Sequence, residues 1–540
     1  MSNGVLDYLV IGAGPAGLQL GALLAQGGHD YQILEAGDAP GTFFTTFPRH
    51  RTLISINKPH TGTDDAELNL RMDWNSLLTD DPDLLFTRYT GRYFPPAGEM
   101  VRYLADFAAA LDLRIRYGTR AVRVTRLAGG DEGDGFAVTD QDGAVWRTRR
   151  LVIATGVSRP YVPPIPGIET AEQYATVSVD PDDFTDARVL ILGKGNSALE
   201  TADNLIETAA VIHVAGPGSL RLAWKTHYVG HLRAVNNNFL DTYQLKSQNA
   251  ILDGNVLSIE RVEHRYRVRF SFSRADEVVK ELWYDRVIVC TGFGFDASPF
   301  AEDCRPDLMY NDRFAALSPA YESVNVPGLY FAGTLMQQRD FKKSTSGFIH
   351  GFRYSVRALY HILRQRHHER PWPHREVAAD PDAVTDAVLD RVNRTSALWQ
   401  QFGVLGDLVV VAAAGPARYL EEVPVSHAAQ GVFGDEYFAV TLEYGPDHDK
   451  VDPFDITVRR TAQDAAADAH DASYLHPVVR HHRGGRVVAT HHVAENLENE
   501  WSRPLAHRAP LREFLARELA GPGGPAGTPD AAQVPAPVAR

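Results

Sequence analysis

The chain has 540 residues, 44% of them hydrophobic, and a formal net charge of −14 from 54 Lys and Arg against 68 Asp and Glu. This length exceeds what one hydrophobic core usually serves, so we expect two or three domains. The acidic balance argues against a nucleic-acid partner, and no run reaches the ~18 apolar residues that a membrane span needs.

The two cysteines, Cys290 and Cys304, exclude a disulfide scaffold and suit a reducing compartment. The apolar N-terminus is short, has no preceding basic cluster and runs into a glycine turn, so it is typical of a buried strand rather than a signal peptide. We therefore expect a cytoplasmic, globular protein. A homo-oligomer remains open.

The first 35 residues predict a strand, a glycine-rich turn, a helix and a second strand. Gly12 permits the tight turn, Gly14 lets backbone amides approach a pyrophosphate, and Gly17 lets the helix pack closely on the strand. The second strand ends at Glu35, within reach of a cofactor ribose. The sequence 12–17, which is Gly-Ala-Gly-Pro-Ala-Gly, therefore predicts a dinucleotide site.

The same pattern returns in the middle of the chain, where an apolar run at 189–192 precedes Gly193-Lys194-Gly195-Asn196-Ser197-Ala198. The strand at 211–214 ends without an acid, and Arg221 and Lys225 follow it. A cation attracts the 2′-phosphate of NADPH, so this second site is predicted to prefer NADPH over NADH. The alternative, that Arg221 is a solvated loop residue, stays open.

The order of these segments predicts an α/β fold with two Rossmann-like, doubly wound dinucleotide-binding domains, the second inserted in the first. The strands at 151–156 and 287–292 both end in Thr-Gly, and the run 328–333 returns to the first domain. We expect the first domain at 1–165 and 293–370, the second at 166–292, a C-terminal α+β extension at 371–520 and a disordered tail at 521–540.

The paired glycine motifs, the two Thr-Gly strand ends and the late Phe331-Ala332-Gly333 resemble two-dinucleotide-binding-domain flavoproteins of the flavin-containing monooxygenase superfamily. The closest likeness is to the endoplasmic-reticulum flavoprotein associated with degradation and its bacterial relatives. That likeness rests on residues 47–51, 53–58, 73–78, 226–230, 241–247, 347–354, 393–396 and 419–422.

The resemblance implies FAD in the first site and NAD(P)H in the second. A helix starting near Phe348 could point its N-terminus at the flavin. Thr334 stands where the superfamily usually carries Asp, and its hydroxylase fingerprint is absent before Gly193. The residues expected to bind the two cofactors are Gly12, Gly14, Pro15, Ala16, Gly17, Glu35, Ala36, Thr42, Phe43, Thr155, Gly156, Gly193, Gly195, Asn196, Ser197, Ala198, Arg221, Lys225, Thr291, Gly292, Gly333, Thr334, Gly347 and Phe348.

Thiol redox catalysis is not expected, because Cys290 and Cys304 form no close pair in the sequence. Hydride transfer from NADPH to FAD and then to oxygen remains. Asn57 resembles the active-site Asn of flavin-containing monooxygenases, where an amide would support a C4a-hydroperoxide. The alternative is that Asn57 caps a turn before Pro59.

We therefore expect an FAD- and NADPH-dependent monooxygenase that oxygenates a small molecule, an amine among the candidates, in specialised metabolism. The alternatives are a flavin oxidase or reductase that passes electrons to oxygen or to a protein partner, and a nucleotide-sensing protein. The extension at 371–520 is expected to cover the site or mediate assembly.

The histidines of this extension are not expected to bind a metal. A two-residue turn at Gly484-Gly485 would place His482 opposite Val487 and His491 opposite Val478, so the His pairs would be offset.

Overall fold

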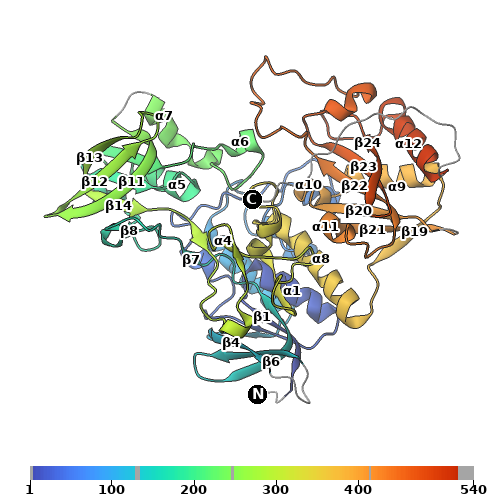
Figure 1. The fold of residues 1–540 in the computed structure, drawn as a ribbon, viewed down its shortest axis with the longest axis horizontal. Helices are drawn as coiled ribbons and strands as arrows, with labels where there is room; N and C mark the ends of the chain where they lie inside the picture. The colour runs from blue at the N-terminus through green and yellow to red at the C-terminus, as the bar shows by residue number, and fades with distance from the viewer. Residues whose placement is uncertain (1–3, 128–133, 245–247, 413–414, 521–540) are drawn as a thin grey trace.

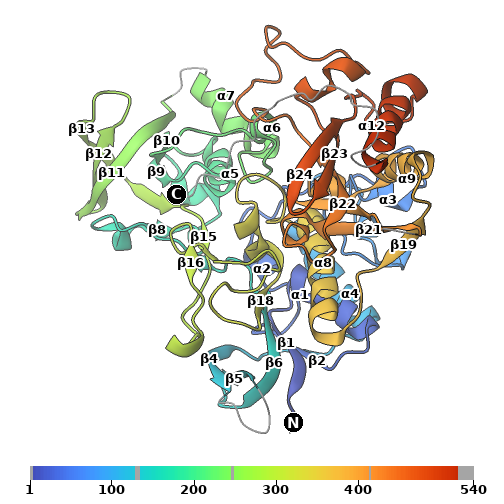
Figure 2. The ribbon, with the colours of Figure 1, turned by 45° about the vertical axis from the view of Figure 1, so that its right-hand side comes forward.

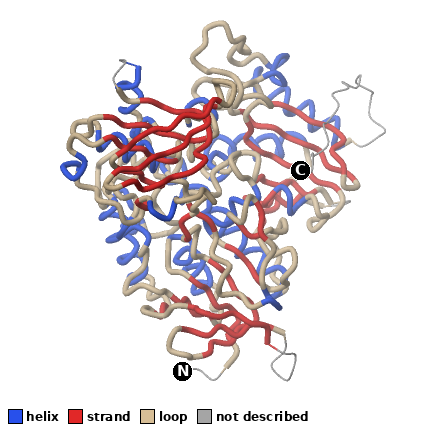
Figure 3. Tube along the Cα trace, turned by 60° about the vertical axis from the view of Figure 1, so that its left-hand side comes forward, coloured by secondary structure: helices blue, strands red, loops and turns tan. Residues whose placement is uncertain are grey.

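Three large sheets organise the computed structural model, which describes residues 4–127, 134–244, 248–412 and 415–520. Figure 1 shows the first sheet at the foot of the molecule, the second at the upper left in green and the C-terminal sheet at the upper right in orange and red. The strands form three separate groups in Figure 3. The predicted disordered tail at 521–540 lies outside the described residues.

The first sheet has the strand order β3-β2-β1-β6-β5-β4, and β18 pairs with β6. β1, β2, β3, β6 and β18 pair in parallel, whereas β4, β5 and β6 form an antiparallel layer. Residues 329–331 therefore join a sheet that residues 6–153 begin. The strands are β1 (Leu6–Ile11), β2 (Tyr31–Leu34), β3 (Ile115–Arg116), β4 (Ala121–Leu127), β5 (Gly135–Asp140), β6 (Val145–Ile153) and β18 (Leu329–Phe331).

Helices α1 (Pro15–Gln26), α4 (Ala97–Ala110) and α8 (Ile349–His368) pack with this sheet, with α1 against α8. Short helices α2 (Phe43–Thr46) and α3 (Ala66–Asn69) lie in the connection between β2 and α4.

The second sheet has the order β13-β12-β11-β10-β9-β14-β8, again with a parallel centre and an antiparallel edge. Two short ladders, β15 with β7 and β16 with β17, lie outside the large sheets. The elements of this part are β7 (Arg159–Pro160), β8 (Glu172–Gln173), β9 (Arg188–Leu192), α5 (Asn196–Leu205), β10 (Val211–Gly216), α6 (Ala223–Thr226), α7 (Asn238–Gln244), β11 (Ala250–Val262), β12 (Arg265–Phe272), β13 (Val278–Tyr284), β14 (Arg286–Val289), β15 (Phe293–Gly294), β16 (Leu308–Met309) and β17 (Phe314–Ala315).

The C-terminal sheet is antiparallel throughout, in the order β19-β21-β20-β22-β23-β24. Together with the two parallel-centred sheets it confirms the predicted fold class. Its elements are β19 (His374–Val377), α9 (Pro381–Arg394), α10 (Ala397–Gln400), β20 (Leu405–Val410), β21 (Ala417–Pro424), α11 (Val425–Ala428), β22 (Glu436–Glu443), β23 (His476–Arg483), β24 (Arg486–His492) and α12 (Ala509–Leu519).

The C-terminal sheet shares a hydrophobic core with the first sheet. One continuous cluster joins Tyr8 and Leu18 to Val409, Phe438 and Leu515. α8 runs between the two sheets in Figure 2, with twelve of its residues buried. The extension at 371–520 therefore packs together with the first sheet around one core. No helix among the described residues is long and apolar enough to cross a membrane.

The hairpin of β23 and β24 turns at Gly484 and Gly485, whose φ angles are 56° and 75°. His482 pairs with Val487 as predicted, but His491 pairs with Val479 rather than with Val478. The difference arises because a β-bulge after His481 adds one residue and shifts the register. Within the described ranges, no cluster of three or more His, Cys, Asp or Glu side chains could hold a metal.

Candidate functional site

The turn after β1 forms an open cradle at the start of α1. Gly12 has φ +105°, and a Cβ there would lie 2.8 Å from the carbonyl oxygen of Ala154, whereas a Cβ on Gly17 would lie 1.9 Å from the oxygen of Gly12. A Cβ on Gly14 would meet no protein atom within 4 Å. The helix then begins at Pro15, so its free N–H groups face this open space. Such a cradle fits the pyrophosphate of a dinucleotide.

Glu35, at the end of β2, is buried and already accepts three hydrogen bonds. The donors are the amides of Ala13 (2.7 Å) and Gly37 (2.8 Å) and the hydroxyl of Thr42 (3.1 Å). Because a carboxylate has about four acceptor positions, one is left for a cofactor ribose. The Glu35 carboxylate thus also fixes the turn that carries Ala36 and Thr42, and its ribose contact stays a prediction.

A cavity of about 400 Å³ lies between the two nucleotide motifs. It is lined by the starts of both motif helices, Gly14 and Pro15 of α1 and Asn196 and Ser197 of α5. Several other predicted cofactor residues line it as well: Ala16, Phe43, Thr155, Gly156, Thr334, Gly347 and Phe348. A single cavity therefore reaches both dinucleotide sites, as direct transfer between two cofactors requires.

Gly333 and Thr334, which follow β18, hold the segments beside the cavity close together. A Cβ on Gly333 would lie 2.5 Å from Cβ of Ala16, so the segment after β18 approaches α1 more closely than a side chain would allow. The hydroxyl of Thr334 donates to the carbonyl of Gly347 at 3.2 Å. α8 begins directly after Phe348, and its N-terminal partial positive charge therefore lies at the cavity wall.

The second motif repeats the geometry of the first. A Cβ on Gly193 would lie 2.2 Å from the carbonyl oxygen of Cys290, whereas one on Gly195 would meet no protein atom within 4 Å. The side chain of Asn196 is engaged within the protein: it donates to the carbonyl of His231 (2.8 Å) and accepts from the amide of Arg233 (3.0 Å). Ala198, in the first turn of α5, is fully buried.

The other predicted residues of the second site lie around this motif. Thr291 donates to the carbonyl of Tyr161 (2.5 Å). Neither Thr291 nor Gly292 lines the cavity between the two nucleotide motifs. Lys225 lies in the last turn of α6. Lys194 pairs with Asp253 and is therefore not free to bind a phosphate.

Arg221 is exposed and lies within a group of basic side chains. Burial, then the charges of Arg221 and Arg313, lower the pKa of Lys342. Burial, then Arg221 and Lys342, lower the pKa of His231 to about 4. Lys342 and Arg313 come from a segment about 100 residues further along the chain, so no local pattern could have indicated their convergence.

Asn57 is fully buried but does not line the cavity. Its side-chain amide donates to the carbonyls of Thr90 (2.7 Å) and Arg92 (3.3 Å), which ties two loops together. The neighbouring Ile54 and Ser55 do line the cavity. The catalytic role of Asn57 stays a prediction, and so does the alternative that it caps the turn before Pro59, since both side-chain bonds go to residues 90 and 92.

A buried acid also lines the cavity. The hydroxyl of Tyr174 donates to the carboxylate of Glu200 and accepts from the amide of Arg49 (3.3 Å). Burial raises the pKa of Glu200 to about 7. A carboxyl group with this pKa can hold or release a proton at neutral pH. Sequence reasoning missed this pair, although Glu200 lies only two residues beyond the second glycine motif.

An aromatic wall closes another side of the cavity. The ring of His350 stacks on Trp74, with 4.2 Å between centroids and an interplanar angle of 25°, and the guanidinium of Arg233 lies 5.0 Å from the Trp74 centroid. Among the described residues, neither ring nitrogen of His350 has a hydrogen-bond partner. A buried donor left unpaired costs about 1–3 kcal/mol, so this wall favours a ligand that pairs it.

The burial and the positions of the two thiols do not suit redox chemistry between them. Cys290 and Cys304 are free and buried, and they belong to different hydrophobic clusters. Burial raises the pKa of both, that of Cys304 to about 11. A dithiol relay within the chain is therefore excluded.

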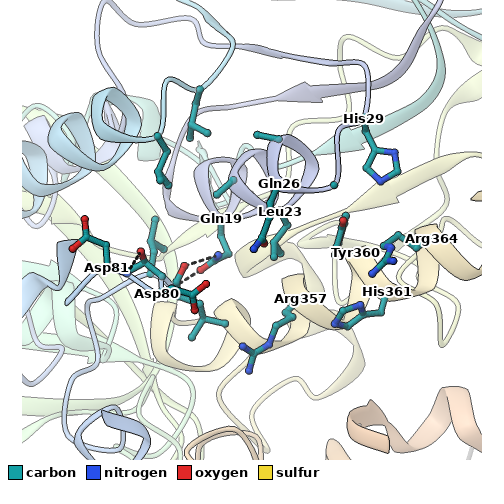
Figure 4. Close-up of a pocket in the computed structure, with 18 of the residues that line it drawn as sticks. Gln19, Leu23, Gln26, His29, Asp80, Asp81, Arg357, Tyr360, His361 and Arg364 are labelled. Carbon is teal, nitrogen blue, oxygen red and sulfur yellow. Dashed lines mark hydrogen bonds between the residues drawn. The ribbon is translucent and has the colours of Figure 1, made fainter. Parts of the chain in front are cut away.

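A larger cavity, of about 1140 Å³, lies on the outer face of α1 and α8. Figure 4 shows Gln19 and Gln26 on one side of it and Arg357, His361 and Arg364 on the other. The Gln19 side chain is held by the backbone of Leu78. No residue of either glycine motif lines this cavity, so it is not the dinucleotide site.

Comparisons of structure agree with the fold of the two nucleotide units. A flavin-containing monooxygenase from Stenotrophomonas maltophilia superimposes with a TM-score of 0.51 at 20% identity, covering 67% of this chain and 99% of that one. Bacillithiol disulfide reductase from Staphylococcus aureus gives a TM-score of 0.51 at 18% identity, with the same coverage. This likeness concerns the fold.

Comparisons of sequence extend further. The chain is 40% identical over 556 residues to FAD-dependent oxidoreductase domain-containing protein 2 of Mus musculus, an alignment that covers 94% of this chain and 83% of the relative. A family model described as pyridine nucleotide-disulphide oxidoreductase matches residues 9–333. The chain therefore belongs to this flavoprotein family and is a flavin-dependent oxidoreductase.

Proposed function

We propose that the protein is an NADPH-dependent flavin monooxygenase that oxygenates a small molecule. The observation that carries the proposal is the single cavity lined by the starts of both α1 and α5. The thiol positions support it, because neither Cys290 nor Cys304 can relay electrons to a disulfide. Oxygen is then the acceptor at hand. From the resemblance of segments such as 53–58 and 347–354, we also propose that the chain is related to the endoplasmic-reticulum flavoproteins associated with degradation and their bacterial relatives.

FAD bound in the first site would supply hydride acceptance and reaction with oxygen. The chain's own groups would bind and orient the cofactor and exchange a proton within the cavity. Gly14 and the start of α1 would hold its pyrophosphate, and the N-terminus of α8 favours negative charge at the cavity wall. Glu200, hydrogen-bonded to Tyr174, can deliver or take up a proton within the cavity.

The proposal is tested by turnover under ¹⁸O-labelled oxygen. The FAD-loaded protein is incubated with NADPH and a metabolite library while NADPH oxidation and peroxide are followed. A product that gains one labelled oxygen atom per NADPH supports a monooxygenase. Peroxide formed in a one-to-one ratio with NADPH for every library compound identifies an oxidase, and absence of NADPH oxidation contradicts both.

The preference for NADPH is part of the proposal and rests on Arg221, Lys342 and Arg313. Arg221→Ala should weaken binding of NADP⁺ far more than of NAD⁺, because only the former loses a charge-assisted phosphate contact of about 1.5–3 kcal/mol. Lys342→Ala provides a second variant with the same expected direction. Equal losses for the two nucleotides would contradict the assignment.

A further inference from the structure

Three side chains from separate parts of the chain meet at one end of the cavity and belong to neither glycine motif. Trp74 follows α3, Arg233 follows α6, and His350 lies in the first turn of α8. Phe348 extends the stack, with its ring 5.9 Å from that of His350 and nearly parallel to it. We call Trp74, Arg233, His350 and Phe348 the aromatic corner.

Arg233 supplies an unpaired positive charge to the aromatic corner. Asn196 holds its backbone amide at 3.0 Å, so the residue is fixed relative to the second glycine motif. In the described part of the chain, no carboxylate forms an ion pair with its half-buried guanidinium, which lies over the Trp74 ring. A desolvated guanidinium without a protein partner is suited to bind an anion.

The other charged residue that lines the cavity, Glu200, does not offset this preference for an anionic ligand. Arg233 and Glu200 are the two charged residues among those that line it. Glu200 is occupied by the hydroxyl of Tyr174, and burial raises its pKa to about 7, so it is protonated for much of the time at neutral pH. A cationic amine would therefore meet Arg233 without a fully charged acid to offset it.

His350 adds a polar contact whose partner lies outside the protein. The residue is 1% exposed, and burial together with Arg353 and Arg233 lowers its pKa well below the usual value. The imidazole is therefore neutral and offers one donor and one acceptor. Neither position is used by another described residue, although the ring stacks on Trp74 and lies nearly parallel to Phe348.

We propose that the aromatic corner is the substrate site and that it takes a planar aromatic carboxylic acid. The carboxylate pairs with Arg233, the ring packs against the Trp74 and His350 stack, and His350 supplies the second polar contact. The later oxygenation of the acid rests on the proposed function. The substrate class proposed here is an anion in place of an amine.

The test is binding of three matched probes to the FAD-loaded full chain, without NADPH and without turnover. Benzoate, benzamide and benzylamine share a ring and differ in the charge of one group. Flavin absorbance changes and calorimetry should show benzoate binding at least about tenfold more tightly than the other two. Benzylamine binding as tightly as benzoate would overturn the proposal.

Variants then assign the contacts. Arg233→Gln should weaken benzoate about tenfold or more, whereas Arg123→Gln, which removes an exposed arginine on β4, should not. His350→Phe keeps an aromatic ring in the stack and should also weaken benzoate. Retained FAD content in each variant shows that the protein has folded.

A cofactor role for Arg233 is the main competing assignment. Arg221→Gln should weaken NADP⁺ and leave benzoate unchanged, and Arg233→Gln should show the opposite pattern. If Arg233→Gln weakens NADP⁺ more than benzoate, the residue belongs to the nucleotide site and the proposal is wrong. Because binding is measured without NADPH and without turnover, failure of oxygen transfer would contradict the proposed function and leave this result intact.

Discussion

At the scale of single residues, glycines of one motif perform different tasks. Gly17 is required by the fold, since a Cβ there would lie 1.9 Å from the backbone oxygen of Gly12. Gly14 is not, since a Cβ there meets no protein atom within 4 Å and its φ of −74° suits any residue. The fold therefore leaves the space beside Gly14 open, where the pyrophosphate is proposed to bind.

We predict that Gly14→Val yields a folded protein without flavin. The valine side chain would occupy the space of the pyrophosphate, so absorbance at the flavin maximum should fall to the level of the apoprotein while the circular dichroism spectrum is retained. Gly17→Val is the matched control and should fail to fold, because the clash is with backbone. Full flavin content in Gly14→Val would show that the first site is misassigned.

A second prediction concerns Glu200, whose pKa is raised from 4.5 to about 7 by burial. The folded state therefore binds this proton more tightly than the unfolded chain does. The resulting stabilisation is fully present below pH 4.5 and is lost as the pH rises towards 7. Glu200→Gln removes the titrating group and still accepts from Tyr174, so its stability relative to the native protein should increase by up to about 3 kcal/mol between pH 4.5 and pH 8.

This difference is measured as the change in melting temperature of variant and native protein at several pH values. Glu207→Gln, an exposed acid just beyond α5, is the control and should show no such trend. A pH-independent difference for Glu200→Gln would mean that the carboxyl group is ionised throughout.

Sequence reasoning at this scale succeeded where function follows from local order. Gly12, Gly14 and Gly17 could be interpreted from their spacing, because a strand, a turn and a helix are contiguous in the chain. Asn57 was assigned by the resemblance of residues 53–58, and its side-chain contacts with a loop about 35 residues away could not be read from that segment. Trp74 and His350 lie 276 residues apart, so only the folded chain reveals their stack.

At the scale of elements, a buried group of charges joins α9 to the C-terminal sheet. Arg391 of α9 donates to Asp407 of β20 at 3.0 Å and to Glu422 of β21 at 3.2 Å, and Arg357 of α8 pairs with Glu422 at 2.6 Å. Asp407 is fully buried, and burial raises its pKa to about 6. Each charge in this group depends on the others to offset its burial.

We predict that Arg391→Gln lowers the free energy of unfolding by about 3–5 kcal/mol, because it leaves buried carboxylates unpaired. Arg394→Gln removes an arginine from the same helix that pairs with Asp65 at a largely exposed position, and it should cost about 1 kcal/mol or less. Adding Asp407→Asn to Arg391→Gln should recover part of the loss. Equal costs for the two single variants, measured by thermal unfolding, would contradict this account.

The hairpin of β23 and β24 shows which features of an element turn chemistry predicts and which it does not. The turn at Gly484-Gly485 was predicted because both residues favour positive φ, and the structure confirms it. The bulge was not predicted, because its extra residue is Val488 of β24, between Val487 and Ala489, where no glycine marks it in the sequence. The register error for His491 is its direct result.

At the scale of the whole molecule, the C-terminal extension supports the cavity wall. Arg71 donates to the carbonyls of Val392, Asn393 and Thr395 at the C-terminal end of α9, at 3.0–3.1 Å. The carbonyl of Arg71 in turn accepts from Trp74 of the aromatic corner at 3.1 Å. One residue therefore links the extension to the proposed substrate site.

We predict that Arg71→Met loosens the extension and weakens benzoate binding together. Three buried carbonyls lose a charged donor worth about 1.5–3 kcal/mol for each hydrogen bond. Limited proteolysis should cut the C-terminal region faster, and the benzoate affinity should fall while FAD remains bound. Arg88→Met, at an exposed ion pair, is the control. Faster proteolysis with unchanged benzoate affinity would separate the extension from the site.

Helix α8 gives this arrangement a thermodynamic consequence. Its 20 residues span about 30 Å and form a single rigid rod, with the aromatic corner at one end, Arg357 in the middle and His368, bonded to Tyr8, at the other. Reciprocity of linked equilibria then applies. If a molecule that binds the C-terminal sheet changes the affinity of the cavity by shifting α8, filling the cavity changes the affinity for that molecule by the same factor.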